Sequence, residues 1–154
     1  MKKRLELIVN GEVREAYVEP WWTLQEVLRT EFALFGVKSG CDTGHCGSCT
    51  VLIDGKAVKS CLILALQARG SNITTIEGLA GKEGLHPIQQ SFLNHFAFQC
   101  GFCTPGMILT AKALLDENPK PTEEEVKRAL TCNICRCTGY VKIVEAILAV
   151  GGKQ

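Results

Sequence analysis

The sequence predicts an α+β protein in which a small mixed sheet, crossed by one helix, precedes a bundle of four helices. Three observations support this fold class. Alternating apolar residues and two hairpin turns fall within the first half of the 154 residues. Apolar residues at helical spacing dominate the second half. Three glycines gather in residues 78–84, where the composition changes, so we divide the chain into domains 1–80 and 81–154.

Two hairpins and one helix are expected in the first domain. Residues 4–9 alternate with the period of a half-buried strand, and residues 13–18 return after Asn10-Gly11. That dipeptide is a strong hairpin signal, because both turn positions must tolerate a positive φ. Thr23 and Glu26 form a capping box that predicts a helix from residue 24 onward.

A second hairpin is expected around Asp54-Gly55, with strands at 50–53 and 56–60, and a closing strand follows at 73–76. Four helices are expected in the second domain. They are predicted for residues 87–98, after Thr104-Pro105, after the capping box of Thr122 and Glu125, and for residues 140–150.

Composition and charge exclude several classes of protein. The formal net charge is +1, which gives no electrostatic case for binding nucleic acid. The longest apolar run, residues 61–66, falls far short of the roughly 20 residues that a membrane helix needs. The basic N-terminus is followed by no uninterrupted apolar segment of the kind found in signal peptides. We therefore expect a cytoplasmic protein with no membrane span.

The nine cysteines are the most informative residues of the chain. An odd number without an export signal disfavours a disulfide framework. Clustered cysteines in a reducing compartment are more often metal ligands. Each predicted domain is also small enough to need a constraint beyond its apolar core, and a bound metal cluster supplies one.

The first group of cysteines has the spacing of a plant-type [2Fe–2S] site. Cys41, Cys46 and Cys49 follow the pattern C-x4-C-x2-C, and Cys61 supplies a fourth thiolate. A structural zinc is the alternative, but zinc sites favour two separate C-x2–4-C pairs. His45 lies inside this loop, and we expect it to be an exposed residue rather than a ligand, because a Rieske-type site needs two histidines.

The second group is less specific by itself. Cys100 and Cys103 form a C-x2-C pair, and Cys132, Cys135 and Cys137 follow, so five cysteines are present for four places. A zinc knuckle and a redox-active C-x2-C motif remain alternatives on spacing alone.

Three stretches together identify a family. Gly40–Val51, Gln99–Met107 and Cys135–Tyr140 resemble the motifs of the small iron–sulfur subunit of the xanthine oxidase family of molybdenum hydroxylases. The resemblance implies a plant-ferredoxin-like β-grasp domain followed by a four-helix bundle, with one [2Fe–2S] cluster in each. It also implies the two sets of metal ligands: Cys41, Cys46, Cys49 and Cys61 in the first domain, and Cys100, Cys103, Cys135 and Cys137 in the second.

The same resemblance implies a function without bond chemistry on this chain. The subunit would relay single electrons between a large subunit that holds the molybdopterin cofactor and a medium subunit that holds FAD, in a dimer of heterotrimers. The cluster of the bundle would be the one nearer to molybdenum, and Gln99 and Cys137 match positions that contact the pterin. The substrate is chosen by the molybdenum subunit and stays open. The alternative is a free-standing two-cluster ferredoxin, although a net charge of +1 disfavours the charged docking surface of such a carrier.

One residue departs from the family pattern. Cys132 stands where the family usually has glycine, and the motif leaves it outside the ligand set, so we expect a buried, inert thiol there. Phe98, Phe102 and Met107 flank the second group and are candidates for a partner interface or for core packing. Trp21-Trp22 is open to the same two interpretations.

Overall fold

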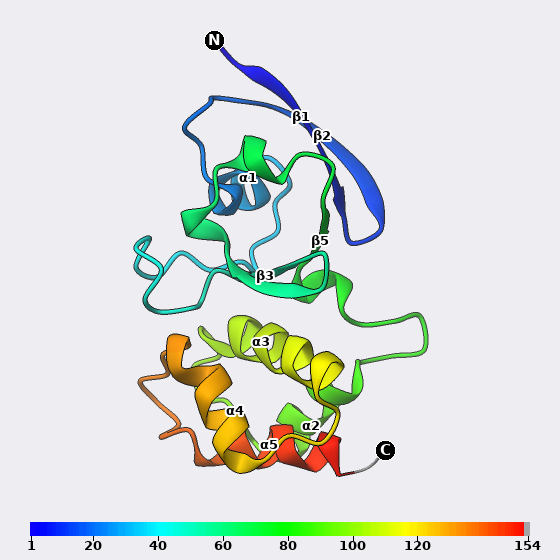
Figure 1. Cartoon of the computed structure of the whole chain (residues 1–154), viewed down its shortest axis with the longest axis vertical. Helices are drawn as coiled ribbons and strands as arrows, with labels where there is room; N and C mark the ends of the chain where they lie inside the picture. Colours follow the sequence, from blue (N-terminus) through cyan, green and yellow to red (C-terminus); the bar gives the residue numbers. More distant parts are fainter. Residues whose placement is uncertain (153–154) are drawn as a thin grey trace.

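The computed structural model describes residues 1–152. The molecule is elongated, with a twisted sheet and helix α1 at one end and helices α2 to α5 at the other (Figure 1). This arrangement confirms the predicted α+β class, and the sheet crossed by a helix matches the expected β-grasp arrangement.

The sheet holds five strands in the order β2-β1-β5-β3-β4. Strands β1 and β5 run parallel, and the remaining neighbours are antiparallel. Both predicted turns are confirmed, because Asn10, Gly11, Asp54 and Gly55 all adopt positive φ values between 49° and 83°. The strands are β1 (Lys3–Val9), β2 (Glu12–Val18), β3 (Thr50–Ile53), β4 (Lys56–Lys59) and β5 (Asn72–Thr74).

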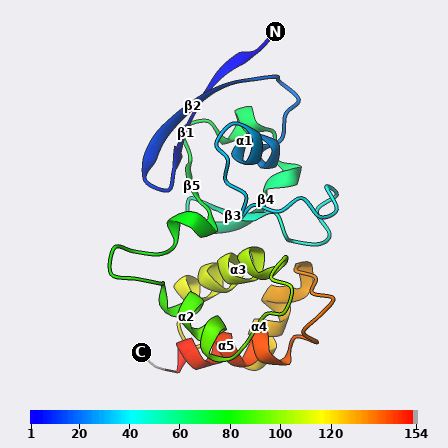
Figure 2. The same cartoon turned by 180° about the vertical axis from the view of Figure 1, so that it is seen from behind.

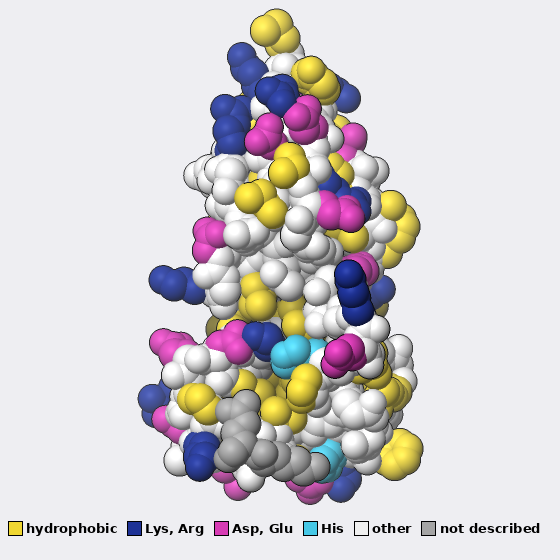
Figure 3. Space-filling view, turned by 90° about the vertical axis from the view of Figure 1, so that its right-hand side faces the viewer, with side chains coloured by type: hydrophobic (Ala, Val, Ile, Leu, Met, Phe, Trp, Pro, Cys, Tyr) yellow, Lys and Arg dark blue, Asp and Glu magenta, His cyan; other side chains and the backbone are white. Residues whose placement is uncertain are grey.

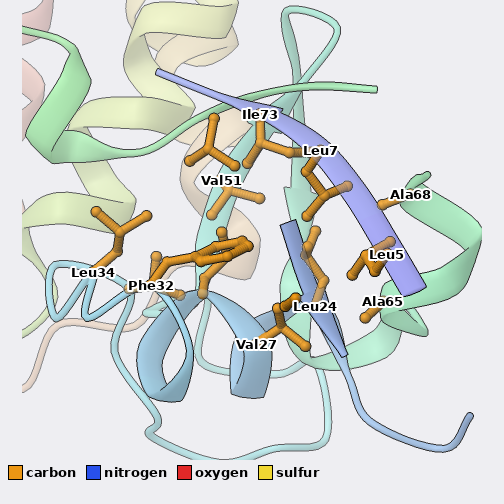
Figure 4. Close-up of a cluster of buried hydrophobic side chains, with 14 of the residues drawn as sticks. Leu5, Leu7, Leu24, Val27, Phe32, Leu34, Val51, Ala65, Ala68 and Ile73 are labelled. Carbon is orange, nitrogen blue, oxygen red and sulfur yellow. The ribbon is translucent and has the colours of Figure 1, made fainter. Parts of the chain in front are cut away.

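Helix α1 (Leu24–Thr30) lies against one face of the sheet and closes the first core. Its capping box is formed as predicted: Glu26 N donates to Thr23 Oγ1 at 3.2 Å, and Thr23 N donates to Glu26 Oε2 at 2.6 Å. Figure 4 shows the buried side chains that meet between β1, β3, β5 and α1. Three short 3₁₀ helices complete this half: η1 (Ser60–Leu62), η2 (Ala65–Ala68) and η3 (Ile76–Gly78).

The four predicted helices of the second half are all present. Helix α2 ends at Asn94 rather than at residue 98, because Phe96 adopts a left-handed φ of 52° and turns the chain. His86 caps this helix with its ring, to which Ile88 N donates at 3.3 Å. The elements are α2 (Pro87–Asn94), α3 (Thr104–Glu117), α4 (Glu123–Ala129), the 3₁₀ helix η4 (Leu130–Cys132) and α5 (Val141–Gly151).

Strand β3 joins the two halves. Its neighbouring residues point to opposite faces, so Val51 belongs to the core under the sheet while Leu52 belongs to the core of the helices. Helix α3 packs against β3 and β4, as Figure 2 shows from behind. The halves therefore meet through a packed interface and not only through the connecting segment.

The surface carries no concentration of one charge on the face shown in Figure 3, where basic and acidic side chains are intermixed. Trp21 is 67% exposed, whereas Trp22 packs against the first core and has Lys2 Nζ 5.3 Å from its ring centroid. Among residues 1–152, no helix has the length and apolar character needed to cross a membrane.

Candidate functional site

All nine cysteines are free thiols, and eight of them lie in two groups on either side of the interface between the halves. We call them the first site, formed by Cys41, Cys46, Cys49 and Cys61, and the second site, formed by Cys100, Cys103, Cys135 and Cys137. These are the two sets that the motifs predicted.

The loop of the first site turns its backbone amides toward sulfur. Asp42, Gly44 and Gly47 adopt left-handed φ values of 55°, 80° and 72°. As a result, the amides of Thr43 and Cys46 both donate to Cys41 Sγ at 3.4 Å. A Cβ atom on Gly44 would lie 2.5 Å from Leu62 Cδ1, so glycine is required here for space as well as for φ.

Hydrogen-bond donors and burial shift the pKa values of the thiols in this site in opposite directions. The hydroxyl of Thr43, together with the amides of Cys46 and Thr43, lowers the pKa of Cys41 to about 6. Burial, followed by a hydrogen bond with Cys49, raises the pKa of Cys61 to about 11. Ser60 holds Cys49 and Cys61 together, because its hydroxyl donates to Cys49 O at 2.6 Å.

The second site brings together two segments about 35 residues apart in the chain. Cys100 Sγ and Cys137 Sγ lie 3.6 Å apart. A disulfide bond would be about 2.05 Å long. Two thiolates bound tetrahedrally to one metal at about 2.3 Å would lie roughly 3.7 Å apart. The observed separation therefore fits two ligands of a shared metal and not a disulfide.

The remaining two thiols of the second site also interact. Burial, followed by a hydrogen bond with Cys135, raises the pKa of Cys103 to about 12. Burial acts in the same direction on Cys135, but hydrogen bonds from the hydroxyl and amide of Thr138 outweigh it, so the pKa of Cys135 is lowered.

The thiols of both sites are thus arranged in pairs. Cys41 interacts with Cys46, Cys49 with Cys61, Cys100 with Cys137, and Cys103 with Cys135. Within residues 1–152, no three or more His, Cys, Asp or Glu side chains are placed to hold one metal ion. A [2Fe–2S] cluster is bound by four thiolates shared between two irons, so paired thiols suit it better than a single zinc ion.

The two sites touch through a tight joint. Ile134 N donates to Cys46 O at 2.8 Å, and Asn133 Nδ2 donates to Gly47 O at 3.2 Å. Asn133 is only 2% exposed. A Cβ atom on Gly47 would lie 2.2 Å from Cys132 O, and one on Gly106 would lie 2.3 Å from Gly47 O. We call this contact of Gly47, Gly106 and Asn133 the glycine joint.

Sequence reasoning missed the role of Asn133. The one signal that pointed toward the joint was Gly106, because glycine in the first turn of a helix is unfavourable unless another segment packs closely there.

The other predicted residues lie around the second site. Gln99 is exposed, and its Nε2 donates to Cys137 O at 3.1 Å. Phe98 and Phe102 are 36% and 46% exposed, whereas Met107 is fully buried and belongs to the core. At the first site His45 is exposed as expected, with its Nδ1 3.1 Å from Thr43 Oγ1.

The prediction for Cys132 was wrong in one respect. The thiol is exposed rather than buried, because residue 132 ends η4 at the surface. Its Sγ lies 4.0 Å from Thr131 Oγ1 and takes part in none of the thiol pairs. The backbone of Cys132, and not its side chain, faces the first site.

Comparison with known proteins agrees with this division into two sites. Residues 7–74 match the 2Fe-2S iron-sulfur cluster binding domain, and residues 75–148 match the [2Fe-2S] binding domain. The chain is 53% identical over 148 residues to the nicotinate dehydrogenase small FeS subunit of Eubacterium barkeri, covering 95% of this chain and 93% of the relative.

Two solved structures extend the comparison. Quinoline 2-oxidoreductase from Pseudomonas putida 86 superposes with a TM-score of 0.94 at 49% identity, covering 98% of this chain and 94% of that one. The aldehyde oxidoreductase of Desulfovibrio desulfuricans ATCC 27774 gives a TM-score of 0.92 at 46% identity, with 97% of this chain matching 17% of that much longer chain. The two family-model matches confirm the prediction of two [2Fe–2S] clusters on this chain.

Proposed function

The chain belongs to the small [2Fe–2S] subunits of the xanthine oxidase family, and from this premise we propose that it relays single electrons between a molybdopterin-containing large subunit and an FAD-containing medium subunit. Its general role as the iron–sulfur, electron-transfer subunit of an oxidoreductase follows from the family. The observation that supports the relay is the glycine joint, which connects the backbones of the two sites directly.

We propose that the first site binds one cluster through Cys41, Cys46, Cys49 and Cys61, and that the second site binds the other through Cys100, Cys103, Cys135 and Cys137. When bound, each cluster takes up and releases one electron at a time. The chain holds the thiols in pairs, surrounds them with amide and hydroxyl donors, and excludes water from Cys49 and Cys61, which are buried. We also propose that the boundary between the two domains lies at residue 80.

The hydrogen bond from Ile134 N to Cys46 O supports a connected route between the sites. Cys46 is a proposed ligand in the first site, and Ile134 directly precedes the proposed ligand Cys135 in the second. A path along the chain from one ligand to the other therefore crosses a single hydrogen bond of 2.8 Å. Two independent clusters would not need so close a contact.

The exposed face of the second site supports its orientation toward the molybdenum subunit. Cys100 and Cys137 are exposed in this chain, as is Gln99, which is hydrogen-bonded to the backbone of Cys137. Phe98 and Phe102 extend this surface with partly exposed apolar rings, which favours burial against a partner subunit. We propose that Gln99 and Cys137 meet the pterin edge there, in a dimer of heterotrimers.

Purification from the native host tests the proposal against the free-standing ferredoxin. A tag on this chain should recover two larger subunits, and substrate should reduce both clusters of the complex within one turnover. Iron analysis should give about four irons per chain, because each cluster holds two. A monomeric protein that no larger subunit accompanies would contradict the proposal and favour the diffusible carrier.

A further inference from the structure

Thr138 makes two contacts with one thiol of the second site. Its hydroxyl donates to Cys135 Sγ at 3.1 Å, and its backbone amide donates to the same atom at 3.4 Å. The hydroxyl contact is the shortest hydrogen bond to sulfur among residues 1–152. Cys135 therefore has the strongest donor environment of the second site.

Tyr140 fixes the direction of this hydroxyl. The amide of Tyr140 donates to Thr138 Oγ1 at 3.2 Å, which occupies a lone pair of the oxygen and leaves its hydrogen for the sulfur. Tyr140 adopts a left-handed φ of 71°, which is uncommon for a residue other than glycine, asparagine or aspartate.

The phenol of Tyr140 holds that conformation from the other side. It accepts from Cys135 N at 2.9 Å and donates to Asn133 O at 3.1 Å. One residue thus contacts both the backbone of Cys135 and the oxygen that donates to its sulfur. Strained backbone of this kind persists where the surroundings hold it, and it is concentrated at functional sites.

No comparable donor serves the other thiols of the second site. Within the described residues, no hydroxyl donates to the sulfur of Cys100, Cys103 or Cys137. In the first site the hydroxyl of Thr43 contributes to the lowered pKa of Cys41, and its oxygen lies 3.1 Å from His45 Nδ1. Among the described residues of the second site, Thr138 is the one whose hydroxyl donates to a thiol.

We propose that Thr138, oriented by Tyr140, is a positioning residue that raises the reduction potential of the second cluster. The inference rests on the proposed ligand role of Cys135. Reduction adds negative charge to the cluster and its thiolates, and a donor aimed at a thiolate stabilises the reduced form more than the oxidised one. Hydrogen bonds to cluster sulfur are a recognised determinant of cluster potential.

The test is a redox titration of the complete enzyme followed by electron paramagnetic resonance, which separates the two clusters by their signals. Thr138→Val keeps the shape of the side chain and removes the hydroxyl. We expect the equilibrium constant for reduction of the second cluster to fall about tenfold, because a charge-assisted hydrogen bond is lost. For a one-electron couple, tenfold corresponds to about 59 mV toward negative potential. Thr138→Ser keeps a hydroxyl and should return most of the shift.

Thr43→Val is the matched control, since it removes the corresponding hydroxyl of the first site and should leave the reduction potential of the second cluster unchanged.

The proposal is overturned if Thr138→Val retains the second cluster at an unchanged potential, or if Thr138→Ser behaves like Thr138→Val. It is also overturned if Thr138→Val shifts the potentials of both clusters equally. Should Thr138→Val fail to load the cluster, Thr138→Ala takes its place. If neither loads while Thr138→Ser does, the hydroxyl is needed for retention rather than for tuning, and the proposal fails. If Cys135 were not a ligand, the result would be a different one, because Cys135→Ser would then leave the paramagnetic resonance signal of the second cluster intact.

Discussion

Replacing Asn133 by leucine should weaken the glycine joint without a large change in side-chain volume. Asn133 Nδ2 donates to Gly47 O, and its Oδ1 accepts from Thr110 Oγ1 at 3.0 Å and from Lys59 Nζ at 3.4 Å. Leucine can make none of these bonds. Gly47 O keeps Thr50 as a donor at 2.7 Å, so that carbonyl stays satisfied.

Most of the expected loss of folding stability comes from Thr110. Thr110 is 6% exposed as a residue, and its hydroxyl loses the acceptor that Asn133 provides. An orphaned buried polar group costs about 1–3 kcal/mol, and the lost bond to Gly47 adds about 1 kcal/mol. Lys59 is less affected, because its ammonium still donates to Thr50 Oγ1 at 3.1 Å. The total is about 2–4 kcal/mol.

The assay is the rate at which the visible absorption of the clusters bleaches in denaturant, because release of a cluster is irreversible and stability is then measured as a rate. A loss of about 2 kcal/mol from the barrier would speed bleaching roughly 30-fold. Electron transfer from the second cluster to the first should also slow, by roughly tenfold, since small displacements of reacting groups carry large rate penalties.

Ser91→Ala is the control. Ser91 is also buried, and its hydroxyl donates to Ala146 O at 2.6 Å, but both residues lie within the helical half and away from the joint. This variant should bleach faster than the natural protein by a smaller factor and should transfer electrons between the clusters at the natural rate. Equal bleaching rates in Asn133→Leu and Ser91→Ala, or an unchanged transfer rate in Asn133→Leu, would refute the reasoning.

Three further predictions concern the thiols. Cys61→Ser should abolish the first cluster signal and Cys103→Ser the second, each leaving the other in place; loss of both signals from either variant would contradict two separate sites. Cys132→Ser should keep both clusters at about four irons per chain, since the thiol is exposed and unpaired with the others; loss of one cluster would make it a ligand. In the cluster-free chain, alkylation at pH 7 should modify Cys41 first, because a pKa of about 6 leaves it mostly thiolate. Its absolute rate should fall as the pH drops below 6, and its lead over the other thiols should shrink as the pH rises and they ionise as well. Cys103, with a pKa of about 12, should be alkylated last. Mass spectrometry of the labelled peptides measures the rate at each cysteine, and equal rates at Cys41 and Cys103 would contradict this order.

Features encoded by neighbouring residues were predictable from the sequence. Asn10-Gly11 sets its own turn, and Thr23 and Glu26 cap a helix through atoms only three residues apart. The cysteine motifs behave in the same way, because the spacing within the first loop fixes which thiols can converge. These local signals were enough to predict the fold class and the first site, whereas the ligand set of the second site came from the resemblance to the family motifs.

Features made by distant partners were not predictable. Asn133 acquires its role from Gly47, 86 residues earlier in the chain, and from Thr110, 23 residues earlier. The early end of α2 depends on Phe96, which takes a left-handed conformation that sequence preference would give to glycine or asparagine. His86 was overlooked as a helix cap because serine, threonine, aspartate and asparagine are the usual caps.

Cys132 shows how the joint tolerates a departure from the family pattern. A glycine is indispensable where φ is positive or where a Cβ atom would collide with a neighbour, and Gly47 meets both conditions. Residue 132 does not adopt a positive φ, and its side chain is directed to the surface. What the joint uses at this position is the carbonyl oxygen, which would lie 2.2 Å from a Cβ on Gly47. Any side chain that stays outside therefore leaves the contact intact, whereas Gly47→Ala on the opposite side would force the two sites apart.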